Sequence, residues 1–335
     1  MTAVIASAPG KIVLCGEYAV LEGAPAICMA VDRRAHVEIY ETDNDVQCVV
    51  TSGYFEGKWT YRVRNNRDID WLDGEPPGGG LGLLREAWRT TNSKDAFDIR
   101  LDTREFVDPD SRSKLGLGSS AALTAALVTA LLKATNGSRD AAAEAAKAHS
   151  RLQHGQGSGV DIAASLDGSI IEYRMNDSAS WRYVPWPEGL EYAVYWSGRP
   201  VSTTEKLEKF HEARRRTGSA ESMARLQACA ESVAKAWSAG NNADLLAELG
   251  SYVDALMRFG VDHELGIFDA GHEYLAEATR DRDVVYKPCG AGGGDIGIAL
   301  ATDRQAIEEF TGVAEKSGYR LLDVALDTRG VLLEG

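Results

Sequence analysis

At 335 residues, the chain exceeds the size at which single hydrophobic cores stop growing, so its length predicts two domains. Its hydrophobic content of 44% is that of an ordinary globular protein. Its formal net charge of −14 excludes a general nucleic-acid or membrane-surface binder, which would present a basic face. A few focused lysines and arginines can still bind a small anionic ligand.

The five cysteines are scattered and form no C-x-x-C pair, which indicates buried or incidental thiols rather than a zinc site. The N-terminal stretch has no basic region followed by a long apolar core, and no apolar run reaches the length of a membrane span. We therefore expect a cytoplasmic protein, a monomer or homodimer, whose partner is a small molecule and not a nucleic acid or a membrane.

The first half of the chain alternates short apolar runs with turns, a pattern that predicts strands. These runs are residues 4–23, 25–31, 35–41, 46–52 and 97–103. The Gly/Pro cluster at 74–82 predicts a loop, which leads into a helix over 83–92. Further helices are predicted after Gly118 and from Ser138 to Gln153, followed over 154–174 by a loop, a helical turn and a strand.

From Trp181 the composition changes, and residues 181–198 predict a pair of strands. Long amphipathic helices follow at 204–216, 219–240, 242–259 and 267–281. Alternating strands at 296–302 and 320–328 close the chain. The change in pattern near 175–185 predicts one domain over 1–178 and a second over 179–335.

The stretch KLGLGSSAALTAALVTALL, from Lys114 to Leu132, places glycines and serines at the start of a strongly apolar helix. The first turn of a helix has unpaired N–H groups and a partial positive charge, so it binds phosphate readily. Glycines let a ligand approach the backbone closely. The alternative is a plain N-cap, in which Ser119 or Ser120 caps a buried helix.

Three other segments suggest ligand contacts. KPCGAGGGDIGIAL, residues 287–300, concentrates glycines whose backbone entropy makes a bare turn a costly explanation. GQGSGVD ends at Asp161 where a helix begins, and the alternative for Asp161 is a carboxylate favoured by the helix dipole. Lys11 enters an apolar strand, an unusual place for a lysine unless its ammonium meets a carboxylate or phosphate.

Common nucleotide and hydrolase motifs do not account for these segments. The chain has no G-x-x-x-x-G-K-[ST] and no G-x-S-x-G. GLGSSA matches G-x-G-x-x-A, but the preceding FVDPDSRSKL is not the strand that a dinucleotide-binding fold requires.

APGKIVLCGEYAVLEG, KLGLGSSAALTAAL and KPCGAGGGDIGIAL resemble, in order and separation, the three sequence blocks of the GHMP small-molecule kinases. The resemblance runs from about Ala8 to Leu300. GEYAVLEG, AHSRLQHGQGSGVDIAASLDGS and SGRPVSTTEKL are most similar to the phosphomevalonate kinase group of the mevalonate pathway. The resemblance implies an α+β, two-lobed fold, with a ribosomal protein S5-like N-terminal lobe, a ferredoxin-like C-terminal lobe and the site between them.

The resemblance also implies an ATP- and Mg²⁺-dependent phosphotransferase whose acceptor is a phosphorylated small molecule. Lys11 and Asp161 would be catalytic: Asp161 orients the acceptor, and Lys11 keeps Asp161 ionised and stabilises charge on the phosphoryl group. Ser120 would contact the metal. The ATP-binding residues would be Lys114, Gly116, Leu117, Gly118, Ser119, Ser120 and Ala121. The acceptor-binding residues would be Glu17, Tyr18, Ser158, Gly159, Arg199, Ser202, Thr203, Gly290, Ala291, Gly292 and Gly293.

Two positions depart from the patterns of relatives. Mevalonate kinases place a metal-binding Glu eleven residues before the catalytic Asp, and Ser150 occupies that position here. Cys289 stands where a Ser is common. The alternatives are a mevalonate kinase, another GHMP kinase acting on a sugar or amino alcohol, and a non-catalytic nucleotide sensor. Retention of both Lys11 and Asp161 argues against the sensor.

Overall fold

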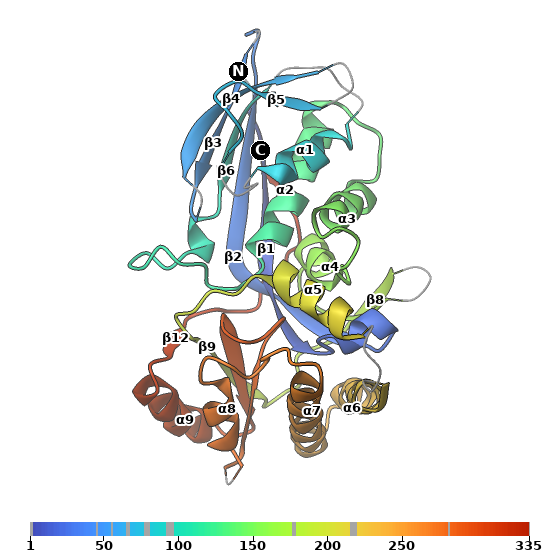
Figure 1. Cartoon of the computed structure of the whole chain (residues 1–335), viewed down its shortest axis with the longest axis vertical. Coiled ribbons are helices and arrows are strands. Elements are labelled where there is room, and N and C mark those ends of the chain that lie inside the picture. The colour runs from blue at the N-terminus through green and yellow to red at the C-terminus, as the bar shows by residue number, and fades with distance from the viewer. Residues whose placement is uncertain are drawn as a thin grey trace. The chain divides into compact units, whose positions relative to one another are not determined.

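The computed structural model of the chain describes residues 3–44, 46–54, 56–64, 68–76, 81–91, 97–175, 179–214, 220–280 and 282–334. The chain divides into two compact units. The first unit comprises Met1–Lys11, Ala30–Ser169 and Leu326–Gly335, and the second comprises Ile12–Met29 and Ile170–Ala325. Figure 1 shows the elements of both units in chain order by colour.

Neither unit is a single continuous segment of the chain. Strands β1 (Ala3–Cys15) and β2 (Ala26–Glu41) each contribute residues to both units, so Ile12–Met29 groups with the second half of the chain. Leu326–Gly335 groups with the first half. The boundary predicted after residue 178 falls on residues 176–178, which lie outside the described residues, and this division of the chain stays a prediction.

The largest sheet has the strand order β13-β1-β2-β6-β3-β4-β5, with β7 pairing with β2 and β8 with β7. β3 and β6 run parallel, with Val49 opposite Ile99. Buried residues alternate with less buried ones along β6, as expected for a strand with one face on the core. The remaining bounds are β3 Gln47–Ser52, β4 Gly57–Val63, β5 Ile69–Trp71, β6 Phe97–Asp102, β7 Ile170–Met175, β8 Ala179–Tyr183 and β13 Leu332–Glu334.

Helix α2 (Ser119–Ala134) is the core helix of the first unit. Every residue from Ala121 to Leu132 is buried, as expected for a helix that is apolar all round. It packs against α1 (Gly82–Trp88), α3 (Ala141–Leu152) and α4 (Val160–Asp167). Figure 1 shows these helices together beside the sheet.

Local capping sets where these helices begin. The predicted start of α3 at Ser138 is three residues early, because the Asp140 carboxylate accepts the N–H of Ala142 and caps the helix there. α2 and α4 begin after Gly118 and Gly159, both at φ 83°, a left-handed conformation that favours glycine. Residue 92 of the helix predicted over 83–92, and residues 77–80 of the predicted loop, lie outside the described residues.

The second unit contains a four-stranded antiparallel sheet in the order β10-β11-β9-β12. One strand, a group of helices, two strands, a helix and a last strand follow one another along the chain, which is the βαββαβ succession of a ferredoxin-like fold. The α+β class and the ferredoxin-like C-terminal part predicted from the sequence are therefore confirmed. The strands are β9 Glu191–Trp196, β10 Val284–Pro288, β11 Ile296–Ala301 and β12 Arg320–Leu322.

Helix α9 packs on all four strands of this sheet, and α7 and α8 pack on β10. The helices are α5 Thr203–Arg214, α6 Ala220–Ala239, α7 Asn242–Asp262, α8 His272–Glu277 and α9 Arg304–Lys316, with a short 3-10 helix η1 at Ala19–Glu22. Residues 215, 216, 219 and 281 of the predicted helices lie outside the described residues. None of the helices in the described ranges is long and apolar enough to cross a membrane.

Candidate active site

Lys11 on β1 lies directly against the glycine loop that precedes α2. Its backbone N–H donates to the carbonyl of Leu117 at 2.8 Å. A Cβ atom on Gly118 would lie 2.9 Å from Cγ and 3.0 Å from Cε of Lys11. Two features therefore require glycine at position 118: its left-handed backbone conformation and the close approach of the Lys11 side chain.

The start of α2 has the features of an anion site. Gly116 and Gly118 adopt φ of 82° and 83°, and no side chain caps the helix at Gly118. Neither Ser119 nor Ser120 is thus an N-cap, and the N–H groups of the first turn are not used by a capping side chain. Ser120 is exposed, whereas the side chains of Leu117 and Ala121 are buried. Leu117 and Ala121 can therefore offer a ligand only backbone groups.

Lys114 lies just before this loop in the sequence. Val107 and Lys114 form an isolated antiparallel bridge, and the Lys114 ammonium lies 4.4 Å from the centre of the Tyr54 ring. The segment before Gly116 is thus a short hairpin and not the buried strand of a dinucleotide-binding fold.

Asp161 is the second residue of α4, in the same unit as Lys11 and Gly118. Its Oδ1 accepts the N–H of Ile162 at 2.9 Å, and its Oδ2 lies 3.7 Å from Nε2 of His149 on α3. Gly159 sets the left-handed turn before α4, and the Ser158 hydroxyl accepts the N–H of Val160. The carboxylate thus faces an imidazole on one side and the helix backbone on the other.

Charges around Asp161 favour its ionised form. Burial alone raises the pKa of Asp161, but His149, Lys11 and the Ile162 N–H together outweigh burial and lower it. A carboxylate with a lowered pKa is a weak base. It suits orientation of an acceptor, or contact with an acceptor that is already anionic, better than removal of a proton from a hydroxyl.

In the second unit, Glu17 is the centre of a buried polar network. Glu17 and Lys287 are 4% and 0% exposed and form an ion pair through Oε1. Oε1 also accepts the N–H of Gly290 at 3.3 Å, and Oε2 accepts the hydroxyl of Tyr252 at 2.8 Å. Tyr252 in turn accepts the N–H of Gly16 at 3.0 Å. Both carboxylate oxygens of Glu17 are therefore engaged by the protein.

Tyr18, like Glu17, contacts the backbone of the glycine-rich segment that follows Lys287. It adopts φ 59°, a left-handed conformation uncommon for a tyrosine, and its hydroxyl donates to the carbonyl of Ala291 at 2.7 Å. Its ring packs against Phe210 of α5 and Phe259 of α7. Burial raises the pKa of Tyr18, so the phenol stays a hydrogen-bond donor. Tyr18 and Glu17 together fix the backbone at Gly290 and Ala291.

The later glycines of this segment are closely packed. A Cβ on Gly292 would lie 2.6 Å from the carbonyl oxygen of Ile267, and one on Gly293 would lie 2.5 Å from the Lys206 ammonium. Lys206 itself donates to the carbonyls of Leu265 and Gly266. These glycines approach Ile267 and Lys206 of the protein itself. Close approach of this cluster to a ligand or to the first glycine loop stays a prediction.

Arg199 lies in a loop that is tied to the end of the glycine segment. Its carbonyl accepts the N–H of Asp295 at 2.7 Å, and a Cβ on Gly294 would lie 2.5 Å from that carbonyl oxygen. The Arg199 side chain is exposed. Ser202 caps α5, because its hydroxyl accepts the N–H of Glu205 at 3.3 Å, and Thr203 begins the helix.

Three residues outside the predicted site contact these segments. His149 faces Asp161, Lys206 touches Gly293, and His272 lies between Tyr286 and the carbonyl of Gly294. Burial lowers the pKa of His272 to about 4, so the ring is neutral, donates from Nε2 to the carbonyl and accepts from the tyrosine at Nδ1. His149 and Lys206 stand inside the stretches AHSRLQHGQGSGVDIAASLDGS and SGRPVSTTEKL, whereas no quoted motif includes His272.

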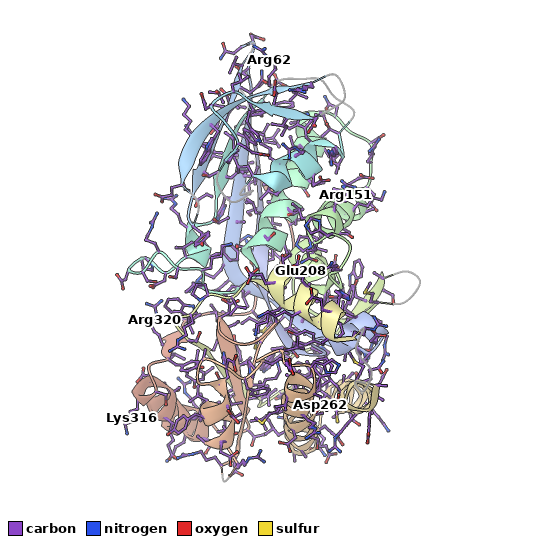
Figure 2. All side chains as sticks on the ribbon, in the orientation of Figure 1. Arg62, Arg151, Glu208, Asp262, Lys316 and Arg320 are labelled. Carbon is purple, nitrogen blue, oxygen red and sulfur yellow. The ribbon has the colours of Figure 1, made fainter. Side chains whose placement is uncertain are left out.

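Two of the basic residues near the motifs are committed to protein carboxylates. Arg151, exposed on α3, pairs with Glu86 of α1, and Figure 2 shows it as a surface position. Lys287 is committed to Glu17. Lys114 and Arg199 are basic side chains that lie at the surface near the glycine segments.

Within the described ranges, no cluster of three or more His, Cys, Asp or Glu side chains could hold a metal ion. Mg²⁺ prefers six oxygen ligands and is commonly bound through phosphates and water with one or two protein groups. The exposed hydroxyl of Ser120 beside uncapped N–H groups fits that pattern. It does not fit a metal held by the protein alone.

The chain is similar to known proteins in both sequence and fold. Residues 79–169 match the GHMP kinases N terminal domain. A phosphomevalonate kinase of Streptomyces sp. is 31% identical over 357 residues, which is 93% of this chain and 93% of that protein. A mevalonate kinase of Methanothermobacter thermautotrophicus is 31% identical over 169 residues, 50% of this chain and 48% of that protein.

The fold is also that of a solved structure, Streptococcus pneumoniae phosphomevalonate kinase in complex with phosphomevalonate and AMPPNP. The TM-score is 0.78 at 21% identity, over 98% of this chain and 100% of that chain. The chain therefore belongs to the GHMP kinase family, a class of small-molecule phosphotransferases.

Gly118→Ala should displace Lys11, because the new methyl group would lie 2.9 Å from its Cγ. We expect kcat/KM for ATP to fall about tenfold or more, equivalent to roughly 1.4 kcal/mol. Gly240→Ala is the matched control, since Gly240 has φ 73° and a Cβ there would have no neighbouring atom within 4 Å. It should cost about 1–2 kcal/mol of stability with full activity. Equal activity of both variants would contradict the assignment of Gly118.

Glu17→Gln should destabilise the protein, because it leaves the buried Lys287 ammonium without its counter-charge. The expected loss in the free energy of unfolding is about 3–5 kcal/mol, measured by urea denaturation. Changing both Glu17 and Lys287 to Met should recover most of that loss. A Glu17→Gln variant with unchanged stability and a raised KM would instead show that Glu17 binds substrate directly.

Proposed function

We propose that the chain is an ATP-dependent kinase that converts 5-phosphomevalonate and ATP to 5-diphosphomevalonate and ADP. The observation that carries the proposal is the grouping of Lys11, Gly118 and Asp161 in one unit, beside an uncapped helix N-terminus. A nucleotide sensor needs the glycine loop but neither the lysine nor the carboxylate. The phosphomevalonate kinase relative that aligns over 93% of the chain supports the choice of acceptor.

In this proposal the N–H groups at the start of α2 hold the ATP phosphates. Ser120 would be the protein contact of Mg²⁺, which would supply positive charge beside the ATP phosphates. Lys11 lies along Gly118 and stabilises negative charge on the phosphoryl group during transfer. The division of the chain into an ATP-binding lobe over 1–178 and a second lobe over 179–335 belongs to this proposal.

A phosphate acceptor suits the chemistry of Asp161. An oxygen of the acceptor phosphate forms a bond to the γ-phosphorus, and the bond from that phosphorus to the β–γ bridging oxygen breaks to release ADP. Because the attacking oxygen is already anionic, no strong base is needed. The lowered pKa of Asp161 is therefore compatible with its orienting the acceptor.

Ser158 and Gly159, next to Asp161, are the acceptor contacts proposed in the first unit. The second unit contains further candidates, which stay predictions from the sequence: the glycine segment Gly290–Gly293 with Tyr18, and the loop containing Arg199, Ser202 and Thr203. Glu17 acts on this group through the backbone of Gly290. A cytoplasmic location belongs to this proposal.

A coupled ADP-release assay over mevalonate, 5-phosphomevalonate, homoserine and galactose tests the proposal. We expect kcat/KM for 5-phosphomevalonate to exceed the others by about a hundredfold or more, because a site built for a phosphate leaves its cation unpaired with the other acceptors. Preference for mevalonate would identify a mevalonate kinase. Nucleotide binding without turnover on any acceptor would identify a sensor.

Arg199→Ala should raise KM for 5-phosphomevalonate about 10- to 100-fold and leave KM for ATP unchanged, since a charge-assisted hydrogen bond is worth about 1.5–3 kcal/mol. Arg304→Ala on α9 is the matched control, because Arg304 is exposed and pairs with Glu308 of its own helix. Equal KM values in the two variants would remove Arg199 from the acceptor site.

A further inference from the structure

His149 is a buried histidine on α3, a helix that packs against α2 and α4. Its side chain is 1% exposed, and Ala145 and Ala148 are buried on the same helix. Helix α3 begins at the Asp140 cap, which fixes the rotation of this face. The position of the imidazole is therefore set by packing rather than by solvent.

The two nitrogens of the His149 ring have different surroundings. Nε2 lies 3.7 Å from Oδ2 of Asp161, whereas Nδ1 is buried without a hydrogen-bond partner among the described residues. A neutral ring with its proton on Nε2 points an N–H at the carboxylate and leaves only an acceptor unpaired. The other tautomer would bury an unpaired N–H and turn a lone pair toward a carboxylate, which costs more.

We propose that His149 is a positioning residue for phosphoryl transfer. Its Nε2 faces Oδ2 of Asp161 at 3.7 Å, longer than a hydrogen bond, and closes on that oxygen in the reacting complex, while the Ile162 N–H holds Oδ1. The inference rests on the proposed function, in which Asp161 orients the acceptor. The carboxylate is then held at both oxygens from two helices, α3 and α4, and cannot rotate away from the reacting phosphate. Such control of orientation is a recognised source of rate enhancement.

The electrostatics agree with this geometry. The side chains that act on Asp161 are His149 from α3, whose Nε2 faces Oδ2, and Lys11 from β1. Both lower the pKa of Asp161, against the effect of burial. Loss of His149 should therefore raise the pKa of Asp161 and move the acid limb of the kcat–pH profile to higher pH.

The test compares His149→Met with His149→Gln, two unbranched side chains of similar length of which only Gln has an N–H to donate. We expect kcat of the Met variant to be about ten- to a hundredfold below wild type, with KM for ATP unchanged and the acid limb shifted upward. The Gln variant should recover most of kcat. His36→Gln, on β2, is the control and should match wild type.

Equal kcat and pH profiles for the Met variant and wild type would overturn the proposal, provided that Asp161→Asn loses turnover. If Asp161→Asn keeps turnover, the proposed role of Asp161 fails and this inference falls with it. ¹⁵N NMR of wild-type protein supplies a measurement that does not depend on a variant folding. A proton on Nε2 of His149 supports the proposal, and a neutral ring with its proton on Nδ1 overturns it.

Discussion

The position of one lysine on β1 constrains the glycine loop before α2 and the carboxylate of Asp161 at the same time. The Lys11 backbone is bonded to Leu117, its alkyl chain lies along Gly118, and its charge lowers the pKa of Asp161. A single residue, Lys11 of β1, thus acts on both the start of α2 and the first turn of α4. Since any side chain on Gly118 would displace Lys11, the conformation of the glycine loop and the position of Lys11 beside Asp161 are one constraint and not two.

The second unit uses a buried charge for a different purpose. The Glu17–Lys287 pair lies out of solvent and engages the backbone at Gly290, and Tyr18 engages Ala291. Buried ion pairs are weak sources of net stability, because desolvation offsets their attraction. The pair instead gives the glycine segment a defined conformation. His272 performs the same task at Gly294 with a neutral ring.

Sequence patterns predict the broad architecture and the position of the glycine loops, because glycine and helix-capping chemistry are local. The ferredoxin-like succession follows only from the family resemblance, since β10 is a five-residue run that the pattern does not separate from the glycine cluster after it. The last predicted strand, 320–328, is shorter in the structure, where β12 ends at Leu322. Helix α9 is absent from the predicted elements, although Ile307, Phe310 and Ala314 recur on one face.

The sequence does not predict which residues contact the side chains of the candidate site. Glu17 and Lys287 are 270 residues apart, and nothing in either motif states that they pair. His149 precedes Asp161 by a helix turn and a loop, and its orientation depends on how α3 packs on α2. Such contacts are tertiary, and a pattern of residue types along the chain contains no information on them.

The most direct measurement is the turnover of a Lys11→Met variant with saturating ATP and 5-phosphomevalonate. Methionine keeps an alkyl chain beside Gly118 and the backbone bond to Leu117, so the fold and the loop should remain. Because the charge that acts on the phosphoryl group and on Asp161 is lost, kcat should fall about a hundredfold or more while the unfolding transition stays near that of wild type. A Lys11→Met variant with wild-type kcat would contradict the account.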